Sequence, residues 1–334
     1  SANNVFRRAP MNALTISAYP YNYESTRIRK PAHAWGWDIT PRMALGGIFR
    51  EARLEELCPD RLIEGFLQIA RFTPKSLMMQ YHYHIATASP DFQDLRLSVE
   101  GVSGESRWSA SEAVWSAQGV LRFDIHDPKL WWPRHYGTPD LYTVTVRLTH
   151  RDKVLFEEQF TCGLRQIKLK ALPVWTDAET PDFQFIVNEV PIRIFGCNHV
   201  PADALHSRDP ERLPKLLDMA CELDCNMLRL WGGGIYESEC FYERCDREGI
   251  LIWHDFMMGC AVYPADAEFK QVLRQEAEAV VRRLRQHPSI ALWAGDNECD
   301  CCIGGWGVVT DPNLNALTRE ILPEVCRNAD PGRP

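Results

Sequence analysis

The sequence predicts a multidomain protein of the β plus α/β class. Between residues 57 and 170, short β-rich runs with period-two alternation recur about every ten residues, as in an antiparallel sandwich. After about residue 172, continuous apolar runs alternate with amphipathic helical patterns, which is typical of parallel strands covered on both faces. The segment before residue 57 is rich in prolines and turns, and it is short for a sandwich of its own.

The composition is that of an ordinary globular protein. The 334 residues are 45% hydrophobic and 25% charged, which is enough material for two or three domains. The net charge of −8 argues against a nucleic-acid partner, and no polybasic patch or apolar run of roughly 18 residues indicates a membrane. Eleven tryptophans and ten tyrosines suit stacking on sugar rings as well as packing in a core.

The twelve cysteines lie at irregular spacings, unlike the disulfide frameworks of small secreted domains. We interpret most of them as reduced and buried. The N-terminal residues lack an apolar segment of signal-peptide length, so we expect a cytoplasmic protein. Cys299, Cys301 and Cys302 lie in the run CDCC, but zinc sites usually show paired CxxC units. We therefore predict no metal and no cofactor.

Strand candidates in the first segment are ALTISAY (13–19) and IFREARLEE (48–56). Six runs predict strands in the second segment: GFLQIARF, MMQYHYHIAT, DLRLSVEG, GVLRFDIHD, YTVTVRLTH and VLFEEQFTCG. His82 and His84 would share one strand face. Without a third ligand, we favour a solvated or hydrogen-bonded face over metal binding for these two residues.

The third segment carries four apolar runs that predict strands: IRIFGCN (192–198), NMLRLWG (226–232), ILIWHDF (250–256) and IALWAGD (290–296). Three helices are expected between them, over 210–224, 238–249 and 265–288. Asp209 and Pro210 would supply the cap and first turn of the first helix, and Gly249 would end the second. The apolar faces of the first and third helices are predicted to be Leu213, Leu216, Leu217, Ala220 and Leu223, and Phe269, Val272, Leu273, Val280 and Leu284.

Polar and aromatic residues gather just after each of these strands: Asn198, His199 and Asp203; Arg229 and Trp231; His254 and Asp255; Asp296, Asn297 and Glu298. Active sites of (β/α)8 barrels form at this end, from several strands at once. Residues 232–234 are not a GxGxxG opening a helix, which disfavours an open dinucleotide-binding sheet. We favour a barrel, and an incomplete one, because only four of its eight strands are visible.

Several long stretches resemble glycoside hydrolase family 2, and within it the β-mannosidase branch. They are WGWDITPR and GGIFREARLE (35–55), LWWPRHYGTPDLYTVTVRL (130–148), CGLRQI (162–167), FGCNHVPAD (195–203), NMLRLWGGGIYE (226–237), FYERCDREGILIWHDFMMGCAVYP (241–264) and HPSIALWAGDNE (287–298). The matches run through nearly the whole chain. This chain has Ile39 where the family's WDWxPR motif has its second tryptophan.

The resemblance implies three domains. Residues 1–56 would be the C-terminal part of a jelly-roll sugar-binding sandwich, and 57–170 an immunoglobulin-like sandwich. Residues 171–334 would be the first half of a catalytic (β/α)8 TIM barrel, and the family's sequence would extend beyond both ends. The implied activity is that of a retaining exo-β-glycosidase acting on terminal β-mannosides. Carbohydrate is the expected partner, and a homo-oligomer stays open.

Retaining glycoside hydrolysis needs two carboxyl groups about 5–5.5 Å apart, one as acid/base and one as nucleophile. The resemblance implies that Glu298 is the acid/base and that Asn297 contacts the sugar 2-hydroxyl. It places the nucleophile beyond Pro334. Without the resemblance, an ordinary exposed loop carboxylate is the better interpretation of Glu298.

Further site residues follow from the same resemblance. Arg229 would support the nucleophile, with a structural ion pair as the alternative, and Trp231 would line the pocket floor or pack in the core. Asn198 and His199 are candidate sugar contacts, although β-mannosidases often carry tryptophan at the position of His199. Asp38 would bind sugar hydroxyls from the first sandwich, which would close the far end of the pocket.

Two acids near these residues have other predicted roles. Asp296 stands where many relatives have asparagine. If the strand persisted to Glu298, the two carboxylates would share one side, and Asp296 would raise the pKa of Glu298 or help hold it. Asp203 is expected to hold the loop after the first strand.

Two alternatives stay open. One is another specificity of the family, such as β-galactosidase, β-glucuronidase or exo-β-glucosaminidase; Asp38 and the stretch RLWGGGIYE favour the mannosidase. The other is a non-catalytic carbohydrate-binding fragment. Residues 1–334 alone are expected to hydrolyse nothing at a useful rate, because the second carboxylate would be absent.

Overall fold

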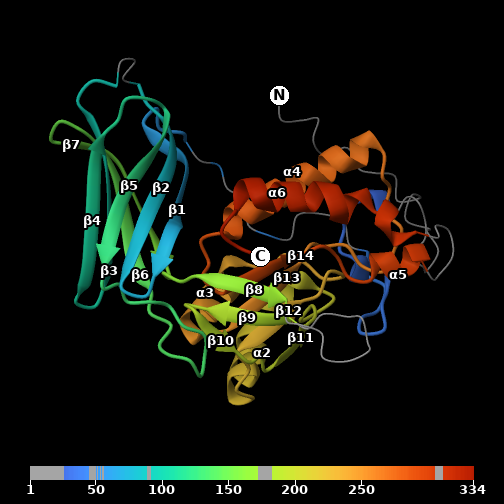
Figure 1. Cartoon of the computed structure of the whole chain (residues 1–334). Coiled ribbons are helices and arrows are strands. Elements are labelled where there is room, and N and C mark those ends of the chain that lie inside the picture. Colours follow the sequence, from blue (N-terminus) through green and yellow to red (C-terminus); the bar gives the residue numbers. More distant parts are fainter. Residues whose placement is uncertain are drawn as a thin grey trace.

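The computed structural model describes residues 26–44, 50, 52, 54, 56–88, 92–171, 183–304 and 311–334. In Figure 1 a β-sandwich of strands β1 to β7 lies beside an α/β part that contains the remaining strands and the helices. No described helix is long and apolar enough to cross a membrane. The predicted strand over 13–19 lies outside the described residues. In the predicted strand over 48–56, none of the described positions belongs to a strand.

The sandwich consists of two antiparallel sheets. One has the order β1-β2-β5 and contains β1 (Arg61–Thr73), β2 (Ser76–Ala86) and β5 (Gln118–His126). The other has the order β4-β3-β6-β7 and contains β3 (Leu95–Ser103), β4 (Ser106–Ala113), β6 (Tyr142–His150) and β7 (Lys153–Cys162). Alternate side chains of both sheets meet in one core, where Leu77, Tyr81, Val99 and Val146 are fully buried.

All six strands predicted between residues 57 and 170 are confirmed, but the sequence missed β8 (Ile167–Ala171), which follows the sandwich, and within the sandwich it missed β4. This strand lies at the edge of its sheet, and of its residues only Trp108 is buried. An edge strand does not need alternating large apolar residues, so its sequence SRWSASEA shows no strand pattern. The Trp108 indole covers Gly101 on β3, where a Cβ atom would lie 2.2 Å from the ring.

The hydrogen-bonding interpretation of His82 is confirmed. Its ring stacks on Phe66 with 4.5 Å between ring centroids, and its Nε2 lies 3.1 Å from Gln68 Oε1. Within the described residues, no cluster of three or more His, Cys, Asp or Glu side chains could hold a metal ion.

A small antiparallel sheet of order β10-β9-β8 follows the sandwich. It contains β8 (Ile167–Ala171), β9 (Phe183–Val187) and β10 (Val190–Ile192). The single strand predicted over 192–198 is wrong, because β10 ends at Ile192 and β11 (Gly196–His199) belongs to a different sheet. The Asn226 side chain holds the connecting backbone, accepting from Phe195 N at 2.8 Å and donating to Arg193 O at 2.9 Å.

The parallel sheet has the sequential order β11-β12-β13-β14. After β11 its strands are β12 (Met227–Leu230), β13 (Leu251–Asp255) and β14 (Ile290–Ala294). Leu228, Ile252 and Ile290 pack with the helices, whereas Met227 and Leu251 pack with the small sheet on the other side. Burial on both sides explains why the sequences of β12, β13 and β14 read as continuous apolar runs, whereas β11 is largely exposed.

The three predicted helices are confirmed as α2 (Asp209–Glu222), α3 (Glu239–Glu248) and α4 (Ala267–Leu284). Gly249 ends α3 in the left-handed conformation, with φ 69°. Shorter helical elements are η3 (Ala32–Trp35), η4 (His206–Arg208), α5 (Cys299–Gly304), η5 (Pro312–Leu314), η6 (Leu317–Ile321) and α6 (Leu322–Ala329).

Some predicted core positions on these helices are wrong. Leu216 and Leu223 of the first helical segment are 37% and 71% exposed, and Val272 of α4 is 42% exposed. The apolar stripe that contacts the sheet is therefore narrower than the sequence pattern suggests. Asp209 lies inside the first turn of α2 rather than at the cap, and its Oδ2 lies 3.0 Å from His206 Nδ1.

Direct hydrogen bonds join the sandwich to the α/β part. Gln286 Oε1 accepts from Leu67 N at 3.0 Å, and Gln286 Nε2 donates to Leu67 O at 3.2 Å, so one amide continues the backbone pairing of β1. Trp131, which is fully buried, donates from Nε1 to Asp246 O on α3 at 2.8 Å. These bonds attach the turn before β14 and helix α3 to the sandwich.

His287 in the turn before β14 predicts how the stability depends on pH. Burial of the ring disfavours its charged form, but hydrogen bonds to Asp246 (2.6 Å) and Glu239 (3.3 Å) outweigh burial and raise the pKa of His287 to about 9. The stabilisation is fully present below the unfolded pKa of about 6.5 and is lost as the pH rises through about 9.

We expect the free energy of unfolding to fall by about 3 kcal/mol between pH 6.5 and pH 9, and His287→Gln to remove this fall. Denaturant unfolding across that pH range measures both. His126→Gln, at an exposed position on β5, is the matched control and should keep the wild-type slope. An unchanged slope in His287→Gln would refute the assignment.

Candidate functional site

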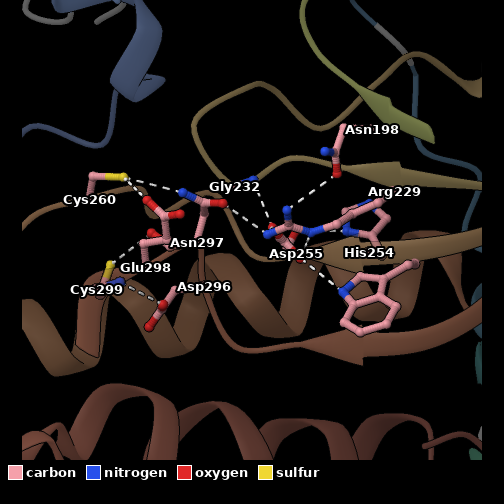
Figure 2. Close-up of polar contacts among 11 residues, drawn as sticks. Asn198, Arg229, Gly232, His254, Asp255, Cys260, Asp296, Asn297, Glu298 and Cys299 are labelled. Carbon is pink, nitrogen blue, oxygen red and sulfur yellow. Dashed lines mark hydrogen bonds and ion pairs between the residues drawn. The ribbon is translucent and has the colours of Figure 1, made fainter. Parts of the chain in front are cut away.

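The candidate site lies where the parallel strands end. Figure 2 shows the Arg229 guanidinium at its centre, between side chains from the other three strand ends. Arg229 donates from Nη1 to Asn198 Oδ1 (3.3 Å) on β11, and from Nη2 to Asp255 Oδ2 (2.6 Å) on β13 and Asn297 Oδ1 (2.9 Å) after β14. The structure therefore brings together three of the predicted site residues, Asn198, Arg229 and Asn297.

Asp255 is the anionic partner of Arg229, and sequence reasoning gave it no role. Its side chain is fully buried, and it also accepts from Gly232 N at 3.0 Å and from Trp253 Nε1 at 3.1 Å. Burial raises the pKa of Asp255 to about 6, against the opposing effect of the Arg229 cation. A charged residue that ends an apolar strand is the signal that could have identified it, because such a group needs a buried counter-charge.

Asn297 is buried and uses both ends of its amide. Besides accepting from Arg229, it donates from Nδ2 to Cys260 Sγ at 3.3 Å. Its backbone pairs with the loop after β13, since Asn297 N donates to Met258 O (2.9 Å) and Cys260 N donates to Asn297 O (2.8 Å). The loop therefore fixes both the backbone and the side chain of Asn297.

Glu298 follows in a left-handed turn with φ 58° and is exposed. The Cys260 thiol donates to its Oε2 at 3.1 Å, as Figure 2 shows. Burial raises the pKa of Cys260 to about 12, and the Glu298 carboxylate adds to this effect, so the thiol remains a hydrogen-bond donor at neutral pH. Cys260 is a residue that sequence reasoning missed. Cys260 and Glu298 are 38 residues apart in sequence, so their contact is a feature of the tertiary structure.

The expected pairing of Asp296 with Glu298 is wrong, because β14 ends at Ala294 and the alternation does not persist. Asp296 Oδ1 instead accepts from Cys299 N at 3.0 Å, and its Oδ2 lies 3.5 Å from Asn315 Nδ2. Burial raises the pKa of Asp296. Its carboxylate therefore holds the turn after β14 rather than touching Glu298.

Trp231 is 8% exposed and packs edge-to-face on Trp37, with 5.0 Å between ring centroids. Beside this contact, His33 N at η3 donates to Gly233 O at 2.9 Å. The segment around residues 32–40 thus lies against the loop after β12. Asp38 is exposed in this segment, next to Trp37.

His199 and Asp203 lie in the first strand and its loop. His199 Nε2 lies 2.9 Å from Glu237 Oε1, both side chains are nearly buried, and the His199 ring packs on Phe241. Asp203 Oδ1 accepts from Leu205 N at 2.8 Å, and its Oδ2 pairs with Arg212 at 2.9 Å. The prediction that Asp203 holds its loop is confirmed, whereas a sugar contact of His199 stays a prediction.

The hydrogen bond from Cys260 to Glu298 leads to a testable prediction, namely that this link affects catalysis. In the full-length protein, we expect Cys260→Ala to lower kcat by about tenfold, because a hydrogen bond to a charged group is worth about 1.5–3 kcal/mol. Cys260→Ser keeps a donor and should stay close to wild type. Equal kcat values for the two variants would contradict the link.

Comparison with known proteins agrees with these features. Residues 83–165 match the family described as glycosyl hydrolases family 2. Beta-mannosidase B of Aspergillus fumigatus is 33% identical over 331 residues, which cover 91% of this chain and 37% of that protein. Beta-mannosidase B of Emericella nidulans is 32% identical over 290 residues, with coverage of 83% and 33%. The chain thus spans about a third of the length of these curated relatives.

Solved structures give the same result. The β-D-mannosidase of Dictyoglomus thermophilum matches with a TM-score of 0.84 and 31% identity, covering 95% of this chain and 40% of that one. A β-glucuronidase of Parabacteroides merdae matches with a TM-score of 0.65 at 18% identity over 82% of this chain and 33% of that one, which shows a shared fold. The resemblance to glycoside hydrolase family 2, and to its β-mannosidases, is confirmed.

Proposed function

We propose that this β-mannosidase-like chain of glycoside hydrolase family 2 carries the acid/base half of a retaining exo-β-glycosidase that removes terminal β-linked mannose. The observation that carries the proposal is the Asn297–Glu298 pair after β14, whose amide is held by Arg229 and whose carboxylate is contacted by Cys260. The similarity to several β-mannosidases supports the sugar.

For the fold we propose the family's three parts: residues 1–56 from a jelly-roll sandwich, 57–170 as an immunoglobulin-like sandwich and 171–334 as the first half of a (β/α)8 barrel. Seven antiparallel strands in sheets of three and four support the second part. The sequential order of four parallel strands supports the third, since a doubly wound sheet reverses its strand order.

In the proposed reaction Glu298 protonates the departing glycosidic oxygen and later deprotonates the attacking water. Asn297 hydrogen-bonds the sugar 2-hydroxyl, a contact that strengthens in the transition state. Arg229 orients Asn297 and balances the Asp255 charge. Asp38, which the contact of Trp37 with Trp231 brings toward the site, binds sugar hydroxyls and closes the far end of the pocket.

A panel of aryl β-glycosides assayed on the full-length protein tests the substrate. We expect kcat/KM for the β-mannoside to exceed that for the β-galactoside, β-glucuronide and β-glucosaminide by at least about tenfold, or about 1.4 kcal/mol in transition-state binding. A higher value for another sugar would assign another specificity of the family. Binding of mannosides without turnover of any glycoside would assign a carbohydrate-binding role.

A further inference from the structure

A second site lies at the opposite end of the parallel sheet, between the sandwich and the α/β part. It is a cavity of about 230 Å³ whose titratable lining includes Arg165, Lys168, Arg285 and Arg333 and a single carboxylate, Asp330. Arg165 binds the backbone at the start of β14, whereas the candidate catalytic residues follow the end of that strand. The cavity is therefore separate from the proposed sugar pocket.

The carboxylates around the cavity do not balance its cations. Arg333 pairs with Asp330 at 2.8 Å, and Arg285 pairs with Glu64 at 2.6 Å. Arg165 and Lys168 have no carboxylate partner among the described residues. Lys168 is exposed, but Arg165 is nearly buried, and a buried charge is normally paired, so the unpaired Arg165 indicates a missing anion.

The hydrogen bonds of Arg165 lead to the same conclusion. Its side chain is nearly buried, and it donates from Nε to Pro288 O (2.8 Å) and from Nη2 to Ile290 O (2.5 Å), both of which are neutral acceptors. Burial and the nearby Arg333 cation lower the pKa of Arg165 to about 9. An anion in the cavity would favour the charged form of Arg165 and raise its pKa again.

Unused donors and rigid positioning complete the site. The Nε atoms of Arg285 and Arg333 are buried and donate to no acceptor in the described part of the chain. The Arg285 guanidinium lies 3.4 Å above the Phe66 ring centroid, and Arg333 Nη2 is held by Arg285 O at 2.9 Å. Fixed planar guanidinium groups match the paired oxygens of a phosphate or sulfate.

We propose that this cavity binds a tetrahedral oxyanion, phosphate or sulfate, through Arg165, Arg285 and Arg333, with Lys168 adding charge. The bound anion would bridge β8 of the small sheet, the turn before β14 and the segment after α6. Sites between domains commonly hold ligands, and an anion here stabilises the contact between the two parts.

The test is calorimetric titration of the full chain with inorganic phosphate, at pH 7 and constant ionic strength set with chloride. We expect saturable binding that sulfate competes for and acetate does not. Absence of saturable heat up to about 10 mM phosphate would overturn the proposal. A Kd of this size corresponds to a binding free energy of only about 3 kcal/mol. Equal competition by acetate would overturn the assignment to a tetrahedral ion.

Two lysines on β8 provide a matched pair of variants. Lys168 and Lys170 are both exposed and two residues apart, but only Lys168 lines the cavity. We expect Lys168→Ala to weaken phosphate binding about threefold and Lys170→Ala to leave it unchanged. Arg165→Gln should weaken binding at least about tenfold. If Arg165→Gln fails to fold, the lysine pair still decides, because equal affinities in its two variants would refute the site.

Discussion

Glu298→Gln in the full-length protein is expected to lower kcat for an aryl β-mannoside with a poor leaving group by about 10²–10⁴-fold. A positioned general acid contributes a factor of this size, and glutamine cannot deliver the proton. For a leaving group that needs little protonation, such as dinitrophenolate, the first step should be much less affected. Steady-state kinetics with a series of leaving groups measures this difference.

Asp300→Asn is the matched control for Glu298→Gln. It is the same carboxyl-to-amide change two residues along the chain, and Asp300 is occupied in an ion pair with Arg319 at 2.8 Å. We expect its kcat to stay within a few-fold of wild type, since a partly exposed ion pair is worth about 1 kcal/mol or less. A similar loss in both variants would show a general effect of charge rather than proton transfer by Glu298.

Arg229→Met has the largest expected effect on stability. It leaves the Asp255 carboxylate fully buried without its cation, and breaking a buried pair in this way costs about 3–5 kcal/mol. Without Arg229 the folded-state pKa of Asp255 rises above its wild-type value of about 6, so the carboxyl group stays protonated in the folded protein to higher pH. A carboxyl group with a raised folded pKa loses stability as the pH rises from its unfolded value of about 3.8 to that folded value.

The cost of Arg229→Met should therefore be smaller at pH 5 than at pH 8, as measured by denaturant unfolding. The double variant Arg229→Met/Asp255→Asn should recover most of the loss at pH 8, because no buried charge remains. Arg212→Met is the control: it breaks the Asp203 pair, in which Arg212 is 51% exposed, and should cost less than about 1 kcal/mol. The account would be contradicted if the loss of stability were the same at pH 5 and pH 8 and if the double variant lost as much as the single variant.

Local patterns in the sequence were enough to predict much of the fold. Period-two alternation identified the strands of the sandwich core, and continuous apolar runs identified β12, β13 and β14. Gly249 identified the end of α3, because glycine takes the left-handed conformation at little cost. Strands β4, β8 and β9 and the break between β10 and β11 escaped prediction. For β4 and for the break, the reason is that an edge position and a change of sheet are properties of tertiary structure.

The same limit applies to the site. The positions of Asn198, Arg229 and Asn297 at or just beyond the ends of their strands predicted that they would meet, because parallel strands end at the same edge. The turn at Glu298 could not be predicted from alternation along β14. Its direction is set by backbone pairing of Asn297 with the loop that carries Cys260, a contact between segments far apart in sequence. The Asp255 partner of Arg229 is likewise separated from it by 26 residues.

The most direct test of the role of Glu298 uses Glu298→Ala in the full-length protein, with dinitrophenyl β-mannoside as substrate and added azide. With this substrate the glycosyl-enzyme forms without an acid, because the leaving group needs little protonation. Water then needs a base in order to attack the glycosyl-enzyme, whereas azide attacks it without a base. We predict that azide accelerates turnover and that the product is β-mannosyl azide, with retained configuration. An unchanged rate, or an α-configured azide, would contradict the assignment of Glu298 as the acid/base of a retaining glycosidase.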